Sequence, residues 1–99
     1  MVIAVSASRE GRVERALIEA VRERGGHCLK LAPLTAGLPD RLCVLPDRPP
    51  LWVECKTDRG YLSPMQVHMT TTLRVEGYDV EVVRTEDGAR AVVAAWTTT

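Results

Sequence analysis

The sequence lacks net charge and is poor in aromatic residues, with no phenylalanine among its 99 residues. Its 13 Lys and Arg residues balance its 13 Asp and Glu residues. Phosphate binding draws mainly on Lys and Arg, so the balance disfavours a protein that holds nucleic acid by bulk charge alone. Base-stacking grooves need clustered aromatics, so Trp52 and Trp96 are expected in the core.

Cysteine is scarce as well, and the spacing of Cys28, Cys43 and Cys55 excludes a zinc motif. We expect buried, reduced thiols of a cytoplasmic protein. No hydrophobic run is long enough to cross a bilayer, and the short apolar N-terminus lacks a basic leader. The length favours a single domain over residues 1–99. Residues 1–8 have no assigned structure, and residues 97–99 are expected to fray.

Hydrophobic periodicity and turn residues predict helix, three strands, helix, strand and a final helix. A mixed sheet with helices packed on its faces, an α/β architecture, buries such elements naturally. The predicted elements cover residues 9–24, 27–31, 41–45, 51–56, 64–76, 79–84 and 86–96.

The most informative feature is a predicted hairpin centred on Asp47. Asp40 and Glu54 are equidistant from Asp47, so antiparallel pairing about that point places their carboxylates opposite each other. Directly opposed residues have Cβ atoms about 5 Å apart. Lys56 lies two residues after Glu54 and therefore projects from the same face of the strand. The hairpin thus predicts two acids and a lysine on one patch.

Two adjacent carboxylates repel each other unless one takes up a proton or a cation joins them. Mg²⁺ suits such a site, because it prefers oxygen ligands and commonly binds one or two carboxylates with water and phosphate. A bound divalent ion can activate water and stabilise charge on a phosphate. The alternative is structural: Lys56 forms a salt bridge with Glu54 or Asp40 on a solvated sheet face.

Three blocks in order resemble the PD-(D/E)XK nucleases, and most closely their VRR-NUC branch, the virus-type replication-repair nuclease domain. They are Gly37-Leu-Pro-Asp-Arg41, Trp52-Val-Glu-Cys-Lys56 and Gly60-Tyr-Leu-Ser-Pro-Met-Gln66. The resemblance implies a restriction-endonuclease-like core with the element order helix, three strands, helix, strand. That is the order predicted independently above, here followed by a C-terminal helix.

The resemblance also implies roles for individual residues. Lys56 is the expected catalytic lysine, and Gln66 matches a glutamine at the start of the following helix. Gln66 could equally close a capping box with Ser63, and both roles could coexist. Glu14 matches an acidic residue on the first helix, although lone helical acids usually face water. The implied metal ligands are Asp40, Glu54, the Cys55 backbone carbonyl and Glu14.

A second set of residues is expected to contact nucleic acid through charge or an aromatic ring. Arginines make the first helix basic, and the loop after Lys56 carries another arginine and a tyrosine. Ordinary solvated side chains are the alternative at these positions. The expected contacts are Arg9, Arg12, Arg41, Arg59 and Tyr61.

These features predict an endonuclease that hydrolyses DNA phosphodiester bonds with Mg²⁺ or Mn²⁺ and no organic cofactor or membrane. Stand-alone members of the resembled branch are typically from phages or bacteria and act as homodimers, which suits a symmetric substrate such as a four-way junction. A non-catalytic nucleic-acid-binding or assembly module is the alternative that the zero net charge favours. A metal-dependent phosphodiesterase acting on RNA is a third.

Overall fold

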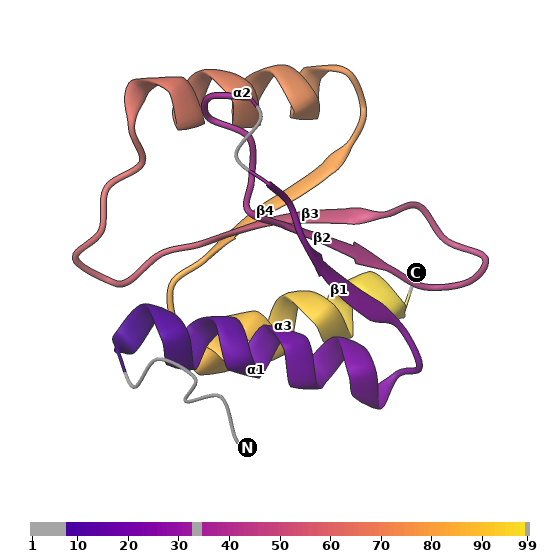
Figure 1. The fold of residues 1–99 in the computed structure, drawn as a ribbon. Helices are drawn as coiled ribbons and strands as arrows, with labels where there is room; N and C mark the ends of the chain where they lie inside the picture. The colour runs from indigo at the N-terminus through magenta and orange to yellow at the C-terminus, as the bar shows by residue number, and fades with distance from the viewer. Residues whose placement is uncertain (1–7, 33–34, 99) are drawn as a thin grey trace.

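The computed structural model describes residues 8–32 and 35–98, and its seven elements follow the predicted order (Figure 1). The boundaries fall within one or two residues of those predicted, and residues 1–7 and Thr99 lie outside the described residues. No helix in the described part is long and apolar enough to cross a membrane. The elements are α1 (Arg9–Glu23), β1 (His27–Lys30), β2 (Arg41–Val44), β3 (Leu51–Cys55), α2 (Pro64–Val75), β4 (Asp79–Val83) and α3 (Glu86–Thr97).

The four strands form one mixed sheet in the order β1-β2-β3-β4. β1 pairs antiparallel with β2, and β2 pairs antiparallel with β3. β4 pairs parallel with β3, because α2 returns the chain to the starting end of the sheet before β4 begins. The predicted α/β fold with a mixed sheet is therefore confirmed.

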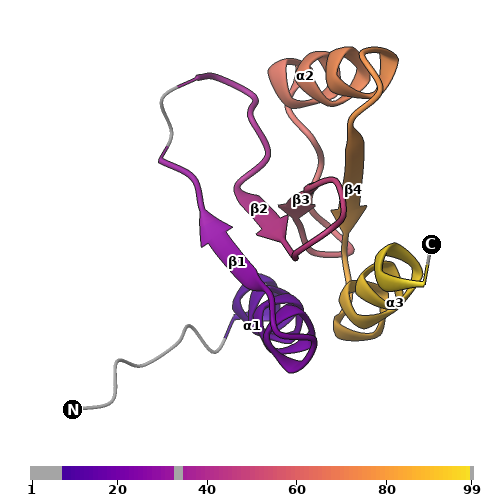
Figure 2. The ribbon, with the colours of Figure 1, turned by 90° about the vertical axis from the view of Figure 1, so that its right-hand side faces the viewer.

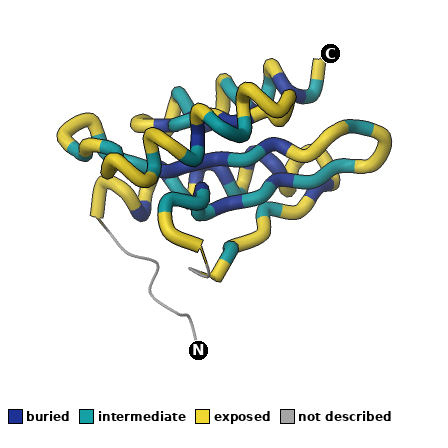
Figure 3. The backbone as a smooth tube through the Cα atoms, turned by 90° about the horizontal axis from the view of Figure 1, so that it is seen from above, coloured by how far each residue is buried: buried dark blue, intermediate teal, exposed yellow. Residues whose placement is uncertain are grey.

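The core lies between the sheet and two of the helices. α1 and α3 lie side by side against one face, and α2 covers the other side near β4 (Figures 1 and 2). Burial follows this layering, with the sheet centre buried and the turns exposed (Figure 3). The predicted apolar stripe of α1 is confirmed as buried: Val13, Ala16, Leu17, Ala20 and Val21.

Local signals in the sequence set the helix ends. Ser63 and Gln66 form the predicted capping box of α2, in which the Ser63 Oγ accepts from the Gln66 N–H at 3.1 Å. Thr85 caps α3 as predicted, accepting from the Gly88 N–H at 2.9 Å. α1 ends where Gly25 adopts a left-handed conformation, φ +80°.

Several side chains differ from the sequence expectation. Thr97 does not fray: it is the last residue of α3, and its Oγ1 accepts from the Arg24 Nε at 3.0 Å. Trp96 is buried as predicted, whereas Trp52 is only half-buried. The three cysteines are free thiols, but Cys28 is partly exposed because it lies on the edge strand β1.

Leu17→Ala tests the position of the core. The Leu17 side chain is fully buried between α1 and the sheet, so its truncation should lower the free energy of unfolding by about 2–5 kcal/mol. Urea denaturation measures the change. Val75→Ala, at an exposed position on α2, serves as the control and should change the free energy by about 0.5 kcal/mol or less. Equal losses in the two variants would contradict this account of the core.

Candidate active site

The β2–β3 hairpin adopts the predicted register. Arg41 lies opposite Val53 and Cys43 lies opposite Leu51. One further step along the same register places Asp40, the residue just before β2, opposite Glu54. The turn is accommodated at Asp47, which takes a left-handed conformation with φ +64°, a conformation that aspartate tolerates better than most residues.

Hydrogen bonds and burial fix Asp40 from both sides. Its Oδ1 accepts from the backbone N–H of Cys55 at 3.2 Å, which ties the carboxylate to the end of β3. Its backbone carbonyl accepts from the Leu31 N–H at 2.9 Å, which continues the β1–β2 pairing. Pro39 is fully buried and anchors the preceding residue. Asp40 is therefore held by two neighbouring strands.

Gly37 explains the first position of the Gly-Leu-Pro-Asp block. It has φ +83°, and a Cβ built there would lie 2.2 Å from the carbonyl oxygen of Met65. Only glycine fits both the left-handed conformation and this close approach. The loop that carries Asp40 thus packs directly against the first turn of α2, the turn that also holds Gln66.

Burial and nearby negative charge raise the pKa of both opposed carboxyl groups. Burial, followed by the charge of Asp40, raises the pKa of Glu54 to about 7, although the nearby Lys56 opposes the rise. Glu54 is only 5% exposed. Burial also raises the pKa of Asp40, and the Glu14 carboxylate adds to this rise against the Cys55 hydrogen bond. The pair is therefore one that a cation would stabilise.

Glu14 and Arg41, which both carry a predicted role, form an ion pair with each other. Arg41 donates from Nε to the Glu14 Oε2 at 3.2 Å, its Nη2 lies 3.1 Å from the same oxygen, and its Nη1 donates to the Cys28 carbonyl at 3.4 Å. Arg41 is only 8% exposed. The Arg41 guanidinium is therefore buried and engaged by Glu14, and its contact with nucleic acid stays a prediction. Glu14 does face the sheet, but it does so as the partner of Arg41.

The structure locates Lys56 and Gln66 without testing their roles. Lys56 is close enough to Glu54 to lower its pKa. Lys56 belongs to none of the ion pairs found among residues 8–32 and 35–98, so the structural salt bridge considered as its alternative role is not formed there. The Gln66 Oε1 accepts from the Ser63 N–H at 2.8 Å, which leaves its amide NH₂ group for another partner.

The predicted metal ligands do not form a cluster of three or more acidic, histidine or cysteine side chains in the described residues. The place of Glu14 in the ligand set stays a prediction, with its Oε2 atom paired to Arg41. The other predicted ligands are Asp40, Glu54 and the Cys55 carbonyl. These are hard oxygen donors that fit Mg²⁺ or Mn²⁺ with water completing the coordination.

The other predicted contacts lie around the loop that follows Lys56. Arg9 pairs with Asp58 of this loop at 3.2 Å. Arg59 is exposed beside it, whereas Tyr61 is 90% exposed further along. Sequence reasoning missed Arg84, which donates to the carbonyls of Thr57 and Gly60 at 2.9 and 2.5 Å and so braces the loop. An arginine at a strand end carries no local signal of such a contact.

Comparison with known proteins finds two similarities that each cover most of the chain. No protein-family model matches the sequence. Over 80 residues it is 35% identical to "Putative nuclease p44" of Acyrthosiphon pisum secondary endosymbiont phage 1, covering 80% of this chain and 86% of that protein. A solved structure of a "VRR_NUC domain" superposes with a TM-score of 0.82 and 28% identity, covering 91% of this chain and 99% of that one. Both likenesses concern the whole fold and not one motif alone.

Gly37→Ala tests how the Asp40 loop is held. Because the added Cβ would collide with the Met65 carbonyl, the free energy of unfolding should fall by about 2 kcal/mol or more in urea denaturation. The matched control is Gly25→Ala, which has the same left-handed conformation, φ +80°, but nothing within 4 Å of the added Cβ. It should lose only about 1 kcal/mol. The account of Gly37 does not survive equal losses at the two positions.

Glu54→Gln tests the electrostatics of the site. A carboxyl group whose pKa is raised in the folded protein binds its proton more tightly there, so stability falls as pH rises from about 4.5 to about 7. In EDTA, Glu54→Gln should reduce the fall in unfolding free energy between about pH 5 and pH 8. The control Glu81→Gln, at an exposed position on β4, should keep it. A pH profile unchanged by Glu54→Gln would refute the assigned environment.

Proposed function

Because the chain belongs to the VRR-NUC family of nucleases, we propose that it is a Mg²⁺- or Mn²⁺-dependent endonuclease of the PD-(D/E)XK type that hydrolyses DNA. The observation that carries this proposal is the opposed pair Asp40 and Glu54 at the open end of the β2–β3 hairpin. Both carboxyl groups have a raised pKa, and Lys56 lies beside them. These are the residues that a cutting centre of this type requires.

The donor set supports the metal dependence. Asp40, Glu54 and the backbone carbonyl of Cys55 would hold the ion, which would supply Lewis-acid stabilisation of charge on the phosphate and a more acidic water. The protein supplies the rigidity of this set, because Asp40 is hydrogen-bonded to β3 and Glu54 lies within the sheet. Acids held in this way on a rigid sheet are preorganised, which favours catalysis.

Lys56 supplies positive charge on the same face of the sheet. Its ammonium group would orient the attacking water or counter the negative charge that develops on the phosphate. Gln66 would present its free amide NH₂ group from the first turn of α2 while its oxygen keeps the capping bond to Ser63. The Gly37 contact supports this arrangement, since it ties the Asp40 loop to that same turn.

Arg41 and Glu14 take a positioning role in this proposal. Arg41 occupies the Oε2 atom of Glu14 and holds that carboxylate near Asp40, where its charge contributes to the raised pKa of Asp40. Neither residue needs to contact the substrate for this effect. The positive charge of Arg41 opposes this rise and keeps the local charge in balance.

We propose further that the protein acts as a homodimer on branched DNA such as a four-way junction. The support is the resemblance to stand-alone VRR-NUC proteins and the small size of the chain, which can cover only a short stretch of duplex. Two active sites related by a two-fold axis suit a substrate with the same symmetry. The zero net charge favours the alternative, a non-catalytic binding module, since bulk attraction to DNA is weak.

Cleavage assays test the proposal. Labelled linear, flapped, single-stranded and four-way DNA are incubated with the protein in Mg²⁺, Mn²⁺ or EDTA. We expect metal-dependent cutting that falls about 100-fold or more in Asp40→Ala, Glu54→Ala and Lys56→Ala, because each removes a group that stabilises the transition state. Glu81→Ala, an exposed glutamate of β4, is the control and should retain activity.

The other outcomes discriminate between the readings. DNA binding without cutting in any metal supports the non-catalytic module. Cutting that survives Lys56→Ala shows that the role given to the lysine is wrong. Equal rates on linear duplex and on the four-way junction remove the junction preference while leaving the nuclease activity intact.

A further inference from the structure

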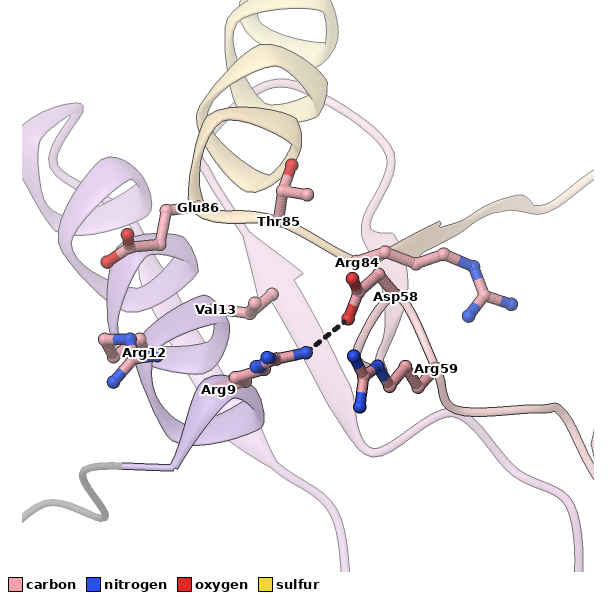
Figure 4. Close-up of a pocket in the computed structure, with 8 residues that line it drawn as sticks. All are labelled: Arg9, Arg12, Val13, Asp58, Arg59, Arg84, Thr85 and Glu86. Carbon is pink, nitrogen blue, oxygen red and sulfur yellow. Dashed lines mark hydrogen bonds and ion pairs between the residues drawn. The ribbon is translucent and has the colours of Figure 1, made fainter.

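A cleft lined by four arginines opens beside the loop that follows Lys56 (Figure 4). We call it the arginine cleft; its volume is about 330 Å³. Three parts of the chain meet there: the first turns of α1, the loop at residues 58–59, and the junction between β4 and α3. The lining residues are Arg9, Arg12, Val13, Asp58, Arg59, Arg84, Thr85 and Glu86.

The backbone connects the arginine cleft to the candidate active site. The Lys56 N–H donates to the Val83 carbonyl at 2.9 Å, so the residue after β3 is fixed against the end of β4. Arg84 directly follows β4, and it holds the loop after Lys56 by donating to the Thr57 and Gly60 carbonyls. Two residues that line the cleft, Asp58 and Arg84, therefore lie just after the ends of the neighbouring strands β3 and β4, close to Lys56.

The charge of the arginine cleft contrasts with that of the chain. The Arg84 guanidinium points away from the cleft, and the other three arginines stand against the carboxylates of Asp58 and Glu86, an excess of one positive charge in a protein with no net charge. Arg59 has no hydrogen-bond or ion-pair partner among the described residues. α1 and α3 also begin here, so the positive ends of two helix dipoles add to the potential.

We propose that the arginine cleft binds a backbone phosphate of the DNA strand that reaches the Asp40–Glu54 centre. This inference rests on the proposed function and identifies a place where the protein would bind the backbone of its DNA substrate. Arginine suits the task, since its planar guanidinium donates two parallel hydrogen bonds to phosphate oxygens. A chain without net charge needs such a local concentration of positive charge to hold DNA.

Asp58 competes with the phosphate in this arrangement. Its carboxylate accepts from the Arg9 Nη1 at 3.2 Å, and the two side chains are 64% and 54% exposed. An ion pair this exposed contributes little stability, so a phosphate can replace the carboxylate at Arg9. Figure 4 shows Arg9, Asp58 and Arg59 close together at the mouth of the cleft, whereas the Arg84 guanidinium points away toward the loop that it braces.

DNA binding without cutting provides the test. The affinity of the full chain for a short fluorescent duplex is measured by anisotropy in EDTA over a range of salt concentrations. Arg59→Gln should weaken binding about five- to tenfold and make the slope of log affinity against log salt shallower by about one. Asp58→Asn should tighten binding several-fold, because it removes the competing carboxylate. Neither residue is buried, so the fold should be retained.

Matched controls lie at the far end of α1, about 15 Å or more from the cleft. Arg22→Gln and Glu23→Gln make the same charge changes there and should leave affinity and slope close to those of the unaltered chain. Equal effects of Arg59→Gln and Arg22→Gln would overturn the proposal, as would unmeasurable binding of the unaltered chain at low salt. The binding test and the cleavage test can fail separately. If the protein cuts DNA with Mg²⁺ but Arg59→Gln binds as tightly as the unaltered chain, only the proposal for the cleft is rejected. If Arg59→Gln weakens binding as expected but no cleavage occurs, only the nuclease proposal is rejected.

Discussion

The pairing register of β2 and β3 is the constraint on which the rest of the site depends. A shift of one residue would move Glu54 from the face of Asp40 to the face of α1 and α3, and it would bring Val53 and Cys55 out of the core. The apolar core therefore enforces the same register that opposes the two acids. The hydrogen bond from the Cys55 N–H to Asp40 then fixes the carboxylate at that position. Stability and site geometry are consequences of one pairing.

The loop before Asp40 couples this hairpin to α2. Gly37 packs against the Met65 carbonyl, and the capping box of Ser63 and Gln66 sets the first turn that Gly37 meets. The first turn of α2, which is distant from Asp40 in sequence, thus helps to position Asp40. The cost is electrostatic, because the pKa of Glu54 is raised to about 7 and that of Asp40 is raised above its ordinary value, mainly by burial. A site that is costly to ionise and rigidly built is more typical of a ligand-binding centre than of a solvated sheet face.

The sequence alone predicted the elements and the hairpin, because both follow from local signals. Helical periodicity, a capping box and a turn centred on Asp47 each concern residues that are near in sequence. The ion pair of Glu14 with Arg41 could not be predicted in this way, since it joins α1 to β2 across the core. For the same reason the burial of Arg41 could not be predicted. The close approach of Gly37 to α2 likewise depends on tertiary packing, although the glycine itself was visible within the Gly-Leu-Pro-Asp block.

The proposed site requires that Asp40 and Glu54 share a single cation. Anomalous diffraction from crystals grown with Mn²⁺ tests it most directly, because the signal locates the ion independently of the protein atoms. We predict a peak in contact with both carboxylates and with the carbonyl oxygen of Cys55. A peak bound by other residues, or a crystal structure in which the two carboxylates diverge onto separate surfaces, would contradict the claim.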